Sequence, residues 1–337
     1  MKKAVFLFIV GVLACAAAIF VPRYLQDYKK SVAQKSVLYI PINCTYEQML
    51  DTVSKAVGDM ESFIKVAQRA NLNEKFKPGR YIFTPDNTNK ELVRTLAMGW
   101  ENPMMLTLSG NIRGLEKLSG ILGKKLAADS AAFMGYLGRE DVWAECGFNK
   151  ENFMGMFLPN TYEVYWTITP EKFVERMKKE YEKFWNGERT VKAKEIGLTP
   201  QEVSVLASIV CEETNYGPEM PRVAGVYMNR LKKGMKLDAD PTVKFALGDP
   251  TIKRILFRHL KVDSPYNTYK NQGLPPGPIT IPSIKGIESV LGYEKHNYLY
   301  FCASPDMDGT HRFARTLVEH NRNAREYQAV LNRMKIK

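Results

Sequence analysis

The sequence predicts an α+β protein behind an N-terminal transmembrane helix. An uncharged apolar run opens the chain, and short β-rich segments then alternate with more numerous stretches of helical periodicity. We find neither an internal repeat nor a low-complexity segment. With 337 residues, of which 45% are hydrophobic and 25% charged, the chain is long enough for two packed domains.

The apolar run is the strongest local signal. It extends from Ala4 to Val21 and stops at Pro22. Roughly 18 residues just suffice to span a bilayer, whereas cleaved signal peptides have a shorter apolar core of about 7–15 residues. We therefore predict an uncleaved anchor over residues 1–22. The alternative, cleavage at a lipoprotein-like box over residues 12–15, fits less well because the apolar run continues beyond that box.

The length of chain on each side of the anchor predicts its orientation. The few residues before the helix cannot hold a domain, so the rest of the chain is expected outside the cytoplasmic (inner) membrane. Polar residues 23–37 are expected to form a juxtamembrane stalk. A small α/β module should follow over residues 38–105, and a larger, helix-rich α/β domain over residues 106–337.

Local signals define elements in both regions. The predicted elements of the module are a strand over 36–42, a helix opened by a capping box at Thr45, a strand over 81–83 and a helix from Thr88 to Gly99. In the larger domain, helices are predicted near 113–138, 170–186, 199–213, 223–231 and 316–334, with a strand over 298–303.

Charge and cysteine content narrow the possible partners. The net charge of +12 is compatible with an acidic partner, but neither zinc-finger spacing nor an RNA-binding aromatic signature occurs, so no nucleic-acid role is expected. Five scattered cysteines and four histidines do not form a metal-ligand pattern. A nucleophilic pair of Cys211 and His311 has no supporting motif, because Cys211 lies inside a predicted helix. We expect neither a metal nor a cofactor.

The helix that begins at Thr199 carries a candidate acid/base group. Its apolar residues Val203, Leu206 and Val210 form one stripe, and Glu213 continues that stripe. A carboxylate in such a position is either paired with a base or partly dehydrated, and dehydration raises its pKa into the range that a general acid needs. Glu212 lies about 100° around the helix. On spacing alone, both glutamates could equally be structural salt-bridge partners at a helix end.

Two later loops, over residues 266–269 and 273–279, could bind a sugar. They combine amide, hydroxyl, aromatic and loop-forming residues, although ordinary turns have the same composition. Together with Asp240 and Thr242 from the preceding segment, the candidate binding residues are Tyr266, Asn267, Thr268, Tyr269, Gly273, Leu274, Pro275 and Gly277.

Blocks of sequence around this helix and these segments occur in a definite order. They are FLPNTY (157–162), ASIVCEET (207–214), RVAGVYMNRL (222–231), ADPTV (239–243), YNTY (266–269), GLPPGPI (273–279), YLYF (298–301), HRF (311–313) and HN (320–321). This series resembles the YceG-like family of endolytic murein transglycosylases. Residues 38–105 resemble the family's LysM-like module, more loosely, and residues 106–337 its catalytic domain.

The resemblance implies a reaction and a role for one carboxylate. The family's catalytic glutamate directly precedes the threonine of the helix motif, which corresponds to Glu213. It implies cleavage of the β-1,4 bond between N-acetylmuramic acid (MurNAc) and N-acetylglucosamine (GlcNAc) within peptidoglycan strands, leaving 1,6-anhydroMurNAc ends. The candidate residues would line the groove, and cell-wall synthesis proteins are possible partners. Many members have acidic residues where this chain has Cys211 and Asn160.

Two other functions remain open at this point. A non-catalytic glycan-binding scaffold of the cell-wall machinery would keep the anchor and the module without needing Glu213. A peptidoglycan hydrolase would use two carboxylates, such as Glu213 and Asp240, and a water molecule.

Overall fold

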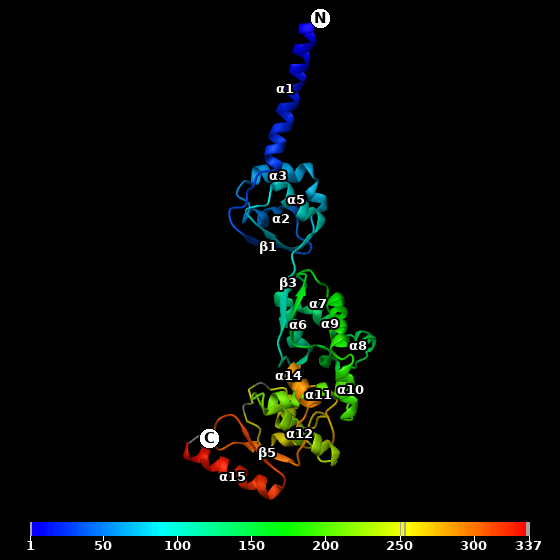
Figure 1. The fold of residues 1–337 in the computed structure, drawn as a ribbon, viewed down its shortest axis with the longest axis vertical. Coiled ribbons are helices and arrows are strands. Elements are labelled where there is room, and N and C mark those ends of the chain that lie inside the picture. Colours follow the sequence, from blue (N-terminus) through cyan, green and yellow to red (C-terminus); the bar gives the residue numbers. More distant parts are fainter. Residues whose placement is uncertain (1, 250, 253, 335–337) are drawn as a thin grey trace. The chain divides into compact units, whose positions relative to one another are not determined.

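A computed structural model describes residues 2–249, 251–252 and 254–334, which form two compact units of mixed helix and strand. The first unit runs up to Leu106 and includes Lys125–Ala128 and Glu163–Ile168. The second contains Thr107–Lys124, Asp129–Tyr162 and the chain from Thr169 onward. Figure 1 shows the course of the chain through these elements. The α+β prediction is therefore confirmed.

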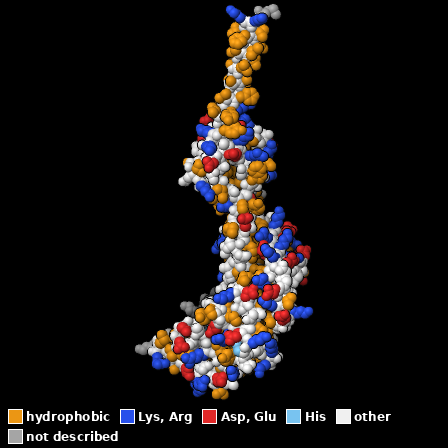
Figure 2. All heavy atoms as spheres, viewed as in Figure 1, with side chains coloured by type: hydrophobic (Ala, Val, Ile, Leu, Met, Phe, Trp, Pro, Cys, Tyr) orange, Lys and Arg blue, Asp and Glu red, His pale blue; other side chains and the backbone are white. Residues whose placement is uncertain are grey.

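Helix α1 (Lys2–Asp27) contains the predicted anchor. It is long and apolar enough to cross a membrane, and none of its apolar window is buried. Figure 2 shows hydrophobic side chains along it. The helix does not end at Pro22, which lies inside it. Its last turn is instead held to the first unit, because Asp27 forms an ion pair with Arg69 at 2.5 Å.

The core of the first unit lies between a two-stranded sheet and its helices. Strands β1 (Ser36–Ile40) and β2 (Gly79–Phe83) pair antiparallel, with Leu38 opposite Tyr81. The side chains alternate along β1, since Leu38 and Ile40 are buried and Val37 and Tyr39 are exposed. The helices are α2 (Tyr46–Ser54), α3 (Met60–Arg69), α4 (Leu72–Lys75) and α5 (Asn89–Met98).

The capping signals in this unit are confirmed. Thr45 and Thr88 both form complete capping boxes, and Gly99 ends α5 with a φ of 68°. A residue with a side chain would be strained at that φ, which explains the glycine.

Part of the predicted stalk, residues 23–37, packs on the first unit instead, while most of its side chains remain exposed. Val32 is 5% exposed within the module core, and Lys29 forms an ion pair with Asp59. The physical reason is that Val32 packs into the module core and Lys29 pairs with Asp59, both through contacts with residues distant in sequence. The module therefore begins before the predicted boundary at residue 38.

The first part of the larger region is mostly helical. Strand β3 (Met104–Leu108) pairs with β4 (Asn160–Val164). The helices are α6 (Gly114–Lys125), α7 (Ser130–Leu137), α8 (Glu140–Glu145), η1 (Phe153–Met156), α9 (Pro170–Phe184) and α10 (Glu188–Glu195). The single helix predicted near 113–138 is in fact two, because the Asp129 side chain accepts a hydrogen bond from the Ala132 N–H and begins α7.

The rest of the second unit is built around α11 (Pro200–Glu213). It packs against α12 (Met220–Lys232), α13 (Asp240–Leu247) and α14 (Ile284–Leu291). The short helix η2 (His259–Lys261) follows α13, and the chain ends in the hairpin β5 (Tyr300–Ala303) and β6 (His311–Ala314) and in helix α15 (Leu317–Arg333). Helix α15 contacts both hairpin strands.

Candidate active site

The site is positioned by the buried helix α11. Its start is fixed by the complete capping box of Thr199 and Glu202, with Pro200 in the first turn. The spacing of apolar residues predicted that α11 is buried along one stripe. In the structure every residue from Val203 to Cys211 is buried, so the helix is enclosed on all sides. Neighbouring helices cover the faces that the sequence pattern did not mark as buried. Glu213 is the last residue of this rigid element.

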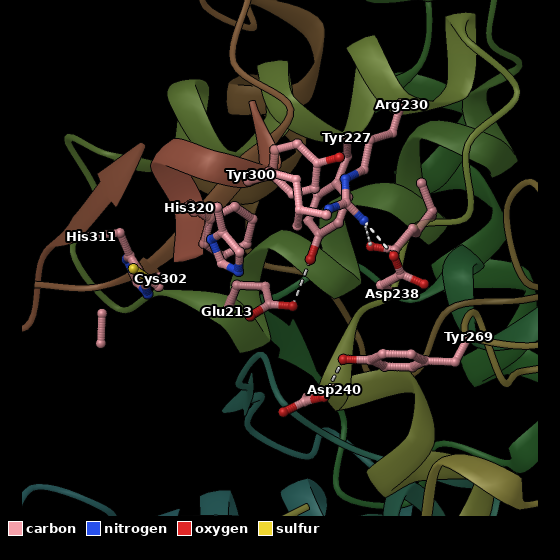
Figure 3. Close-up of a pocket in the computed structure, with 14 residues that line it drawn as sticks. Glu213, Tyr227, Arg230, Asp238, Asp240, Tyr269, Tyr300, Cys302, His311 and His320 are labelled. Carbon is pink, nitrogen blue, oxygen red and sulfur yellow. Dashed lines mark hydrogen bonds and ion pairs between the residues drawn. The ribbon is translucent and has the colours of Figure 1, made fainter. Parts of the chain in front are cut away.

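The environment of Glu213 favours its protonated form. The hydroxyl of Tyr227 on α12 donates a hydrogen bond to Glu213 Oε1 at 2.6 Å (Figure 3). Burial raises the pKa of Glu213 to about 7, and the neighbouring Asp240 carboxylate adds to this rise, while the Tyr227 hydrogen bond and Arg230 oppose it. The carboxyl group can therefore both donate and accept a proton near neutral pH.

The adjacent carboxylate has a different partner. Glu212 forms an ion pair with Arg113. Within the described part of the chain, no lysine, arginine or histidine nitrogen lies within 4 Å of a Glu213 oxygen. The salt-bridge interpretation thus holds for Glu212, whereas Glu213 lacks the cation that would keep it ionised.

Glu213 borders two adjoining pockets, which we call the first and second arms of a groove. The first arm has a volume of about 440 Å³ and the second about 590 Å³. Both arms are lined by Glu213, Ala303 and His311. The first arm is also lined by Tyr227, Arg230, Leu237, Asp238, Asp240, Tyr269, Tyr300, Phe301, Cys302, Leu317 and His320. The second is also lined by Thr214, Asn215, Tyr216, Ser304, Met307, Asp308, Gly309, Thr310 and Tyr327.

Arg230 is a structural cation beneath the first arm. Its guanidinium donates to the carbonyl oxygens of Leu237 and Leu299 and forms an ion pair with Asp238 at 2.9 Å. It also lies 5.1 Å from the ring centroid of Tyr300. One buried side chain on α12 thereby holds the chain before α13 and the strand β5 in place.

Among the predicted binding residues, Asp240 and Tyr269 line the first arm. The Tyr269 hydroxyl donates to Asp240 Oδ1 at 2.7 Å (Figure 3). Burial, followed by this bond to Asp240, raises the pKa of Tyr269. The two side chains reach the arm from separate segments of the chain, so their proximity could not be read from either segment alone.

Thr242, Thr268 and Asn267 are buried beneath those two groove residues. Thr242 donates to the Ala239 carbonyl at 2.7 Å and lies 2.8 Å from the Thr268 hydroxyl, which in turn accepts the Ala239 N–H at 3.0 Å. These bonds fix the residue before Asp240. The Asn267 side chain accepts the N–H of Tyr269 at 3.0 Å. The three residues thus support Asp240 and Tyr269 and do not themselves line the groove.

The remaining predicted binding residues lie outside the two arms. Tyr266 donates to the Glu151 carbonyl at 3.3 Å, and an added Cβ at Gly277 would lie 1.7 Å from that same oxygen. Leu274 packs against the core around α11, Pro275 is buried and Gly273 is partly exposed. The backbone at Gly277 therefore packs so closely against residue 151 that only glycine fits there.

Residue patterns did not single out Tyr227 or the pair of Glu219 and His311. Tyr227 lies four residues after buried Val223 on a predicted helix. A tyrosine on the apolar stripe of that helix could have indicated a buried hydroxyl in need of a partner. Glu219 and His311 are 92 residues apart, and spacing gave no signal for their pairing. Cys211 instead contacts the Ser283 hydroxyl at 3.2 Å, and burial raises its pKa, so the Cys211–His311 pair is not formed.

Comparison with known proteins identifies the relatives of this chain. The model of the YceG-like family matches residues 38–326. The chain belongs to the YceG-like family. The family match therefore covers both the module and the groove around Glu213.

Two curated relatives share part of the family region. A Bacillus subtilis (strain 168) protein named "Endolytic murein transglycosylase" is 43% identical over 122 residues, which are 36% of this chain and 33% of that protein. A Streptococcus pneumoniae (serotype 2, strain D39) protein of the same name is 32% identical over 178 residues, 51% of this chain and 32% of that protein. The chain thus spans about a third of the length of the curated relatives that it matches.

A solved family structure has a similar fold. The crystal structure of a YceG-like protein of Listeria monocytogenes matches with a TM-score of 0.58 at 26% identity. The match covers 86% of this chain and 98% of that one.

Proposed function

We propose that this protein is an endolytic peptidoglycan transglycosylase, a carbon–oxygen lyase that cuts the β-1,4 bond between MurNAc and GlcNAc and leaves 1,6-anhydroMurNAc ends. The observation that carries the proposal is the state of Glu213. Its pKa is about 7, it lacks a paired cation among the described residues, and it borders both arms of the groove. The names of the curated relatives support the same reaction class.

Glu213 would act first as an acid and then as a base. It donates its proton to the bridging oxygen as the bond from that oxygen to muramoyl C1 breaks. The carboxylate then accepts the proton of the muramoyl 6-hydroxyl, whose oxygen forms the new bond to C1. The attacking hydroxyl belongs to the substrate, so its effective concentration is high and no water is consumed. Tyr227 would keep Oε1 occupied by its hydrogen bond, leaving Oε2 for the reaction.

The groove favours a cut within a strand. A polymer with sugars on both sides of the scissile bond needs room on both sides of Glu213, and the two arms supply it. Asp240 and Tyr269 would bind sugar groups in the first arm. Helix α1 would anchor the chain in the cytoplasmic membrane with both units outside, and the first unit would act as a LysM-like glycan-binding module, with cell-wall synthesis proteins as partners.

Mass spectrometry of glycan strands after incubation with the protein tests the reaction. We expect new 1,6-anhydroMurNAc ends, lighter than reducing ends by one water, and fragments of intermediate length before disaccharides. In ¹⁸O-water, no heavy oxygen should enter those ends. Entry of ¹⁸O would instead establish hydrolysis.

A two-carboxylate hydrolase is the second candidate, because Asp240 lines the same arm as Glu213 and raises its pKa. In that reaction, Asp240 would activate water and ¹⁸O would be incorporated. Strand binding without any cleavage would favour the non-catalytic scaffold.

A further inference from the structure

His311 and Glu219 form a buried pair beside Glu213. Both Glu219 oxygens are used: Oε1 accepts the backbone N–H of His311 at 2.9 Å, and Oε2 lies 2.7 Å from His311 Nδ1. The Glu219 side chain is 6% exposed and the His311 side chain 14%. Glu219 is the residue before α12, and His311 begins β6, so the pair joins two elements that border the groove.

The contact with Glu219 favours one tautomer of the neutral His311 ring. A carboxylate only accepts hydrogen bonds, so Nδ1, which lies 2.7 Å from Glu219 Oε2, is placed to be the N–H donor. In the neutral ring, Nε2 is then a hydrogen-bond acceptor. Within the described part of the chain, Nε2 has no hydrogen-bond partner of its own.

The imidazole ring borders the same two pockets as Glu213. His311 lines both arms of the groove, as does Glu213, and Figure 3 shows the two side chains at the border of the same pocket. The ring packs edge-on against Phe301, with centroids 5.3 Å apart. Two contacts with Glu219, one from the His311 backbone and one from its ring, and one aromatic contact therefore hold the imidazole, and Nε2 remains for a ligand.

We propose that His311 binds substrate through Nε2, which accepts a hydrogen bond from a sugar hydroxyl next to the scissile bond, and that Glu219 is the positioning residue that sets this tautomer. The proposal rests on the proposed glycan-cleaving function. Hydroxyls are the most abundant donors on a glycan strand, and a fixed acceptor beside the acid would orient the sugar for attack. The ring would make this contact without entering the proton transfer that Glu213 performs.

A glutamine at position 219 tests the positioning role. Glu219→Gln preserves the shape of the side chain but offers an amide N–H to Nδ1, which allows the tautomer with the proton on Nε2. We expect kcat/KM for strand cleavage to fall about ten- to a hundredfold, mainly through a higher KM, because a protonated Nε2 can no longer accept the hydrogen bond that the sugar hydroxyl donates. The matched control is Glu294→Gln, which removes a carboxylate that pairs with Arg222 outside the groove lining and should leave kcat/KM within about twofold.

Two substitutions of His311 test the substrate contact. An asparagine keeps a polar atom near the Nδ1 position only, whereas the longer glutamine can place its oxygen near the Nε2 position. We expect His311→Gln to keep at least several times more activity than His311→Asn, with similar melting temperatures. Equal activity in the two variants would contradict a contact through Nε2.

The ¹⁵N chemical shifts of the four histidine rings give a readout that does not depend on activity. In the full-length protein, His311 should have a protonated Nδ1 and an unprotonated Nε2, and Glu219→Gln should shift the proton toward Nε2. An unchanged tautomer, or a changed tautomer with unchanged kcat/KM, overturns the proposal. If the wild-type protein cleaves no strands at all, the proposed function fails instead, while the tautomer measurement remains interpretable.

Discussion

Two adjacent glutamates on one helix have opposite environments. Glu212 lies beside Arg113, while Glu213 lies beside the hydroxyl of Tyr227 and within the field of Asp240. Because burial without a paired cation favours the neutral form, Glu213 is suited to donate a proton near neutrality. A rotation of about 100° around the helix separates the ion-paired glutamate from the proposed acid/base group.

Replacing Glu213 by glutamine should abolish strand cleavage. The amide has nearly the same shape but cannot exchange a proton, and loss of a well-placed acid/base group costs about 10²–10⁴-fold or more. Glu212→Gln is the matched control. It replaces the neighbouring glutamate on the same helix, removes its ion pair with Arg113, and should lower the cleavage rate much less. Anhydro-end formation measured by mass spectrometry decides between them. Equal losses at both positions would contradict the assignment.

The same substitution should change the pH dependence of stability. The pKa of Glu213 is raised from 4.5 to about 7 in the folded protein. Between these values the unfolded chain binds fewer protons than the folded one, so this group makes stability fall as the pH rises from about 4.5 to 7. Glu213→Gln removes that contribution. Thermal melts at pH 5 and pH 8 should therefore show a smaller loss for the variant than for the wild type, and a larger loss would refute a raised pKa.

Tyr227 should tune the acid. If protonated Glu213 starts the reaction, kcat/KM should be level below pH 7 and fall about tenfold per pH unit above it. The Tyr227 hydrogen bond favours the carboxylate and so lowers this pKa. Tyr227→Phe should therefore move the falling limb to higher pH. Profiles of kcat/KM against pH test this, and a limb that moves to lower pH would rule out the assigned direction.

At the scale of elements, the start of α13 depends on a buried hydroxyl pair. Thr242→Val keeps the volume of the side chain but removes the bonds to Ala239 and Thr268. Leaving buried polar groups unpaired costs about 1–3 kcal/mol. We expect a loss of that size in the free energy of unfolding, with a rise in KM because Asp240 follows Ala239 directly.

The chain offers a matched control for that prediction. The hydroxyls of Thr161 and Thr107 also pair, at 2.9 Å, but Thr161 is exposed. Thr161→Val should therefore change stability by less than about 0.5 kcal/mol, since water replaces the lost bond. Denaturant titration of both variants tests the difference. Similar losses would mean that burial of the Thr242 pair is not what matters.

At the scale of the whole molecule, the boundary between anchor and module can be located by truncation. A chain that begins at Gln26 loses most of α1 but keeps the contacts of Gln26 and Asp27 with Arg69. It should remain soluble without detergent and melt near the wild-type temperature. A chain that begins at Gln34 also loses buried Val32, and should melt at a lower temperature.

Sedimentation without detergent and thermal unfolding of the two truncated chains test this prediction. If the chain from Gln26 aggregates while the full-length protein is released from membranes by salt alone, α1 is not a membrane anchor. Equal melting temperatures would mean that residues 26–33 are a stalk after all.

Local chemistry in the sequence determined the elements. Capping boxes at Thr45, Thr88 and Thr199 act over three residues, so their helix starts follow directly from the order of residues. The resemblance of the sequence blocks to the family singled out Glu213 as the candidate acid/base residue. The sequence did not predict the break between α6 and α7, because the Asp129 cap competes with the helical periodicity around it. It also did not predict that α1 continues past Pro22, where Asp27 contacts Arg69 far along the chain.

What only the tertiary structure decided is how distant residues meet around Glu213. The sequence by itself determined the apolar first helix, the capped helices and a carboxylate at the end of a buried helix. Asp240 and Tyr269 meet in the first arm, whereas Thr242 and Asn267, from the same motifs, are buried as their supports. Whether a polar residue lines a groove or sits beneath it depends on which neighbours remove its water. Those neighbours are tens of residues away in sequence, beyond the range of any local pattern.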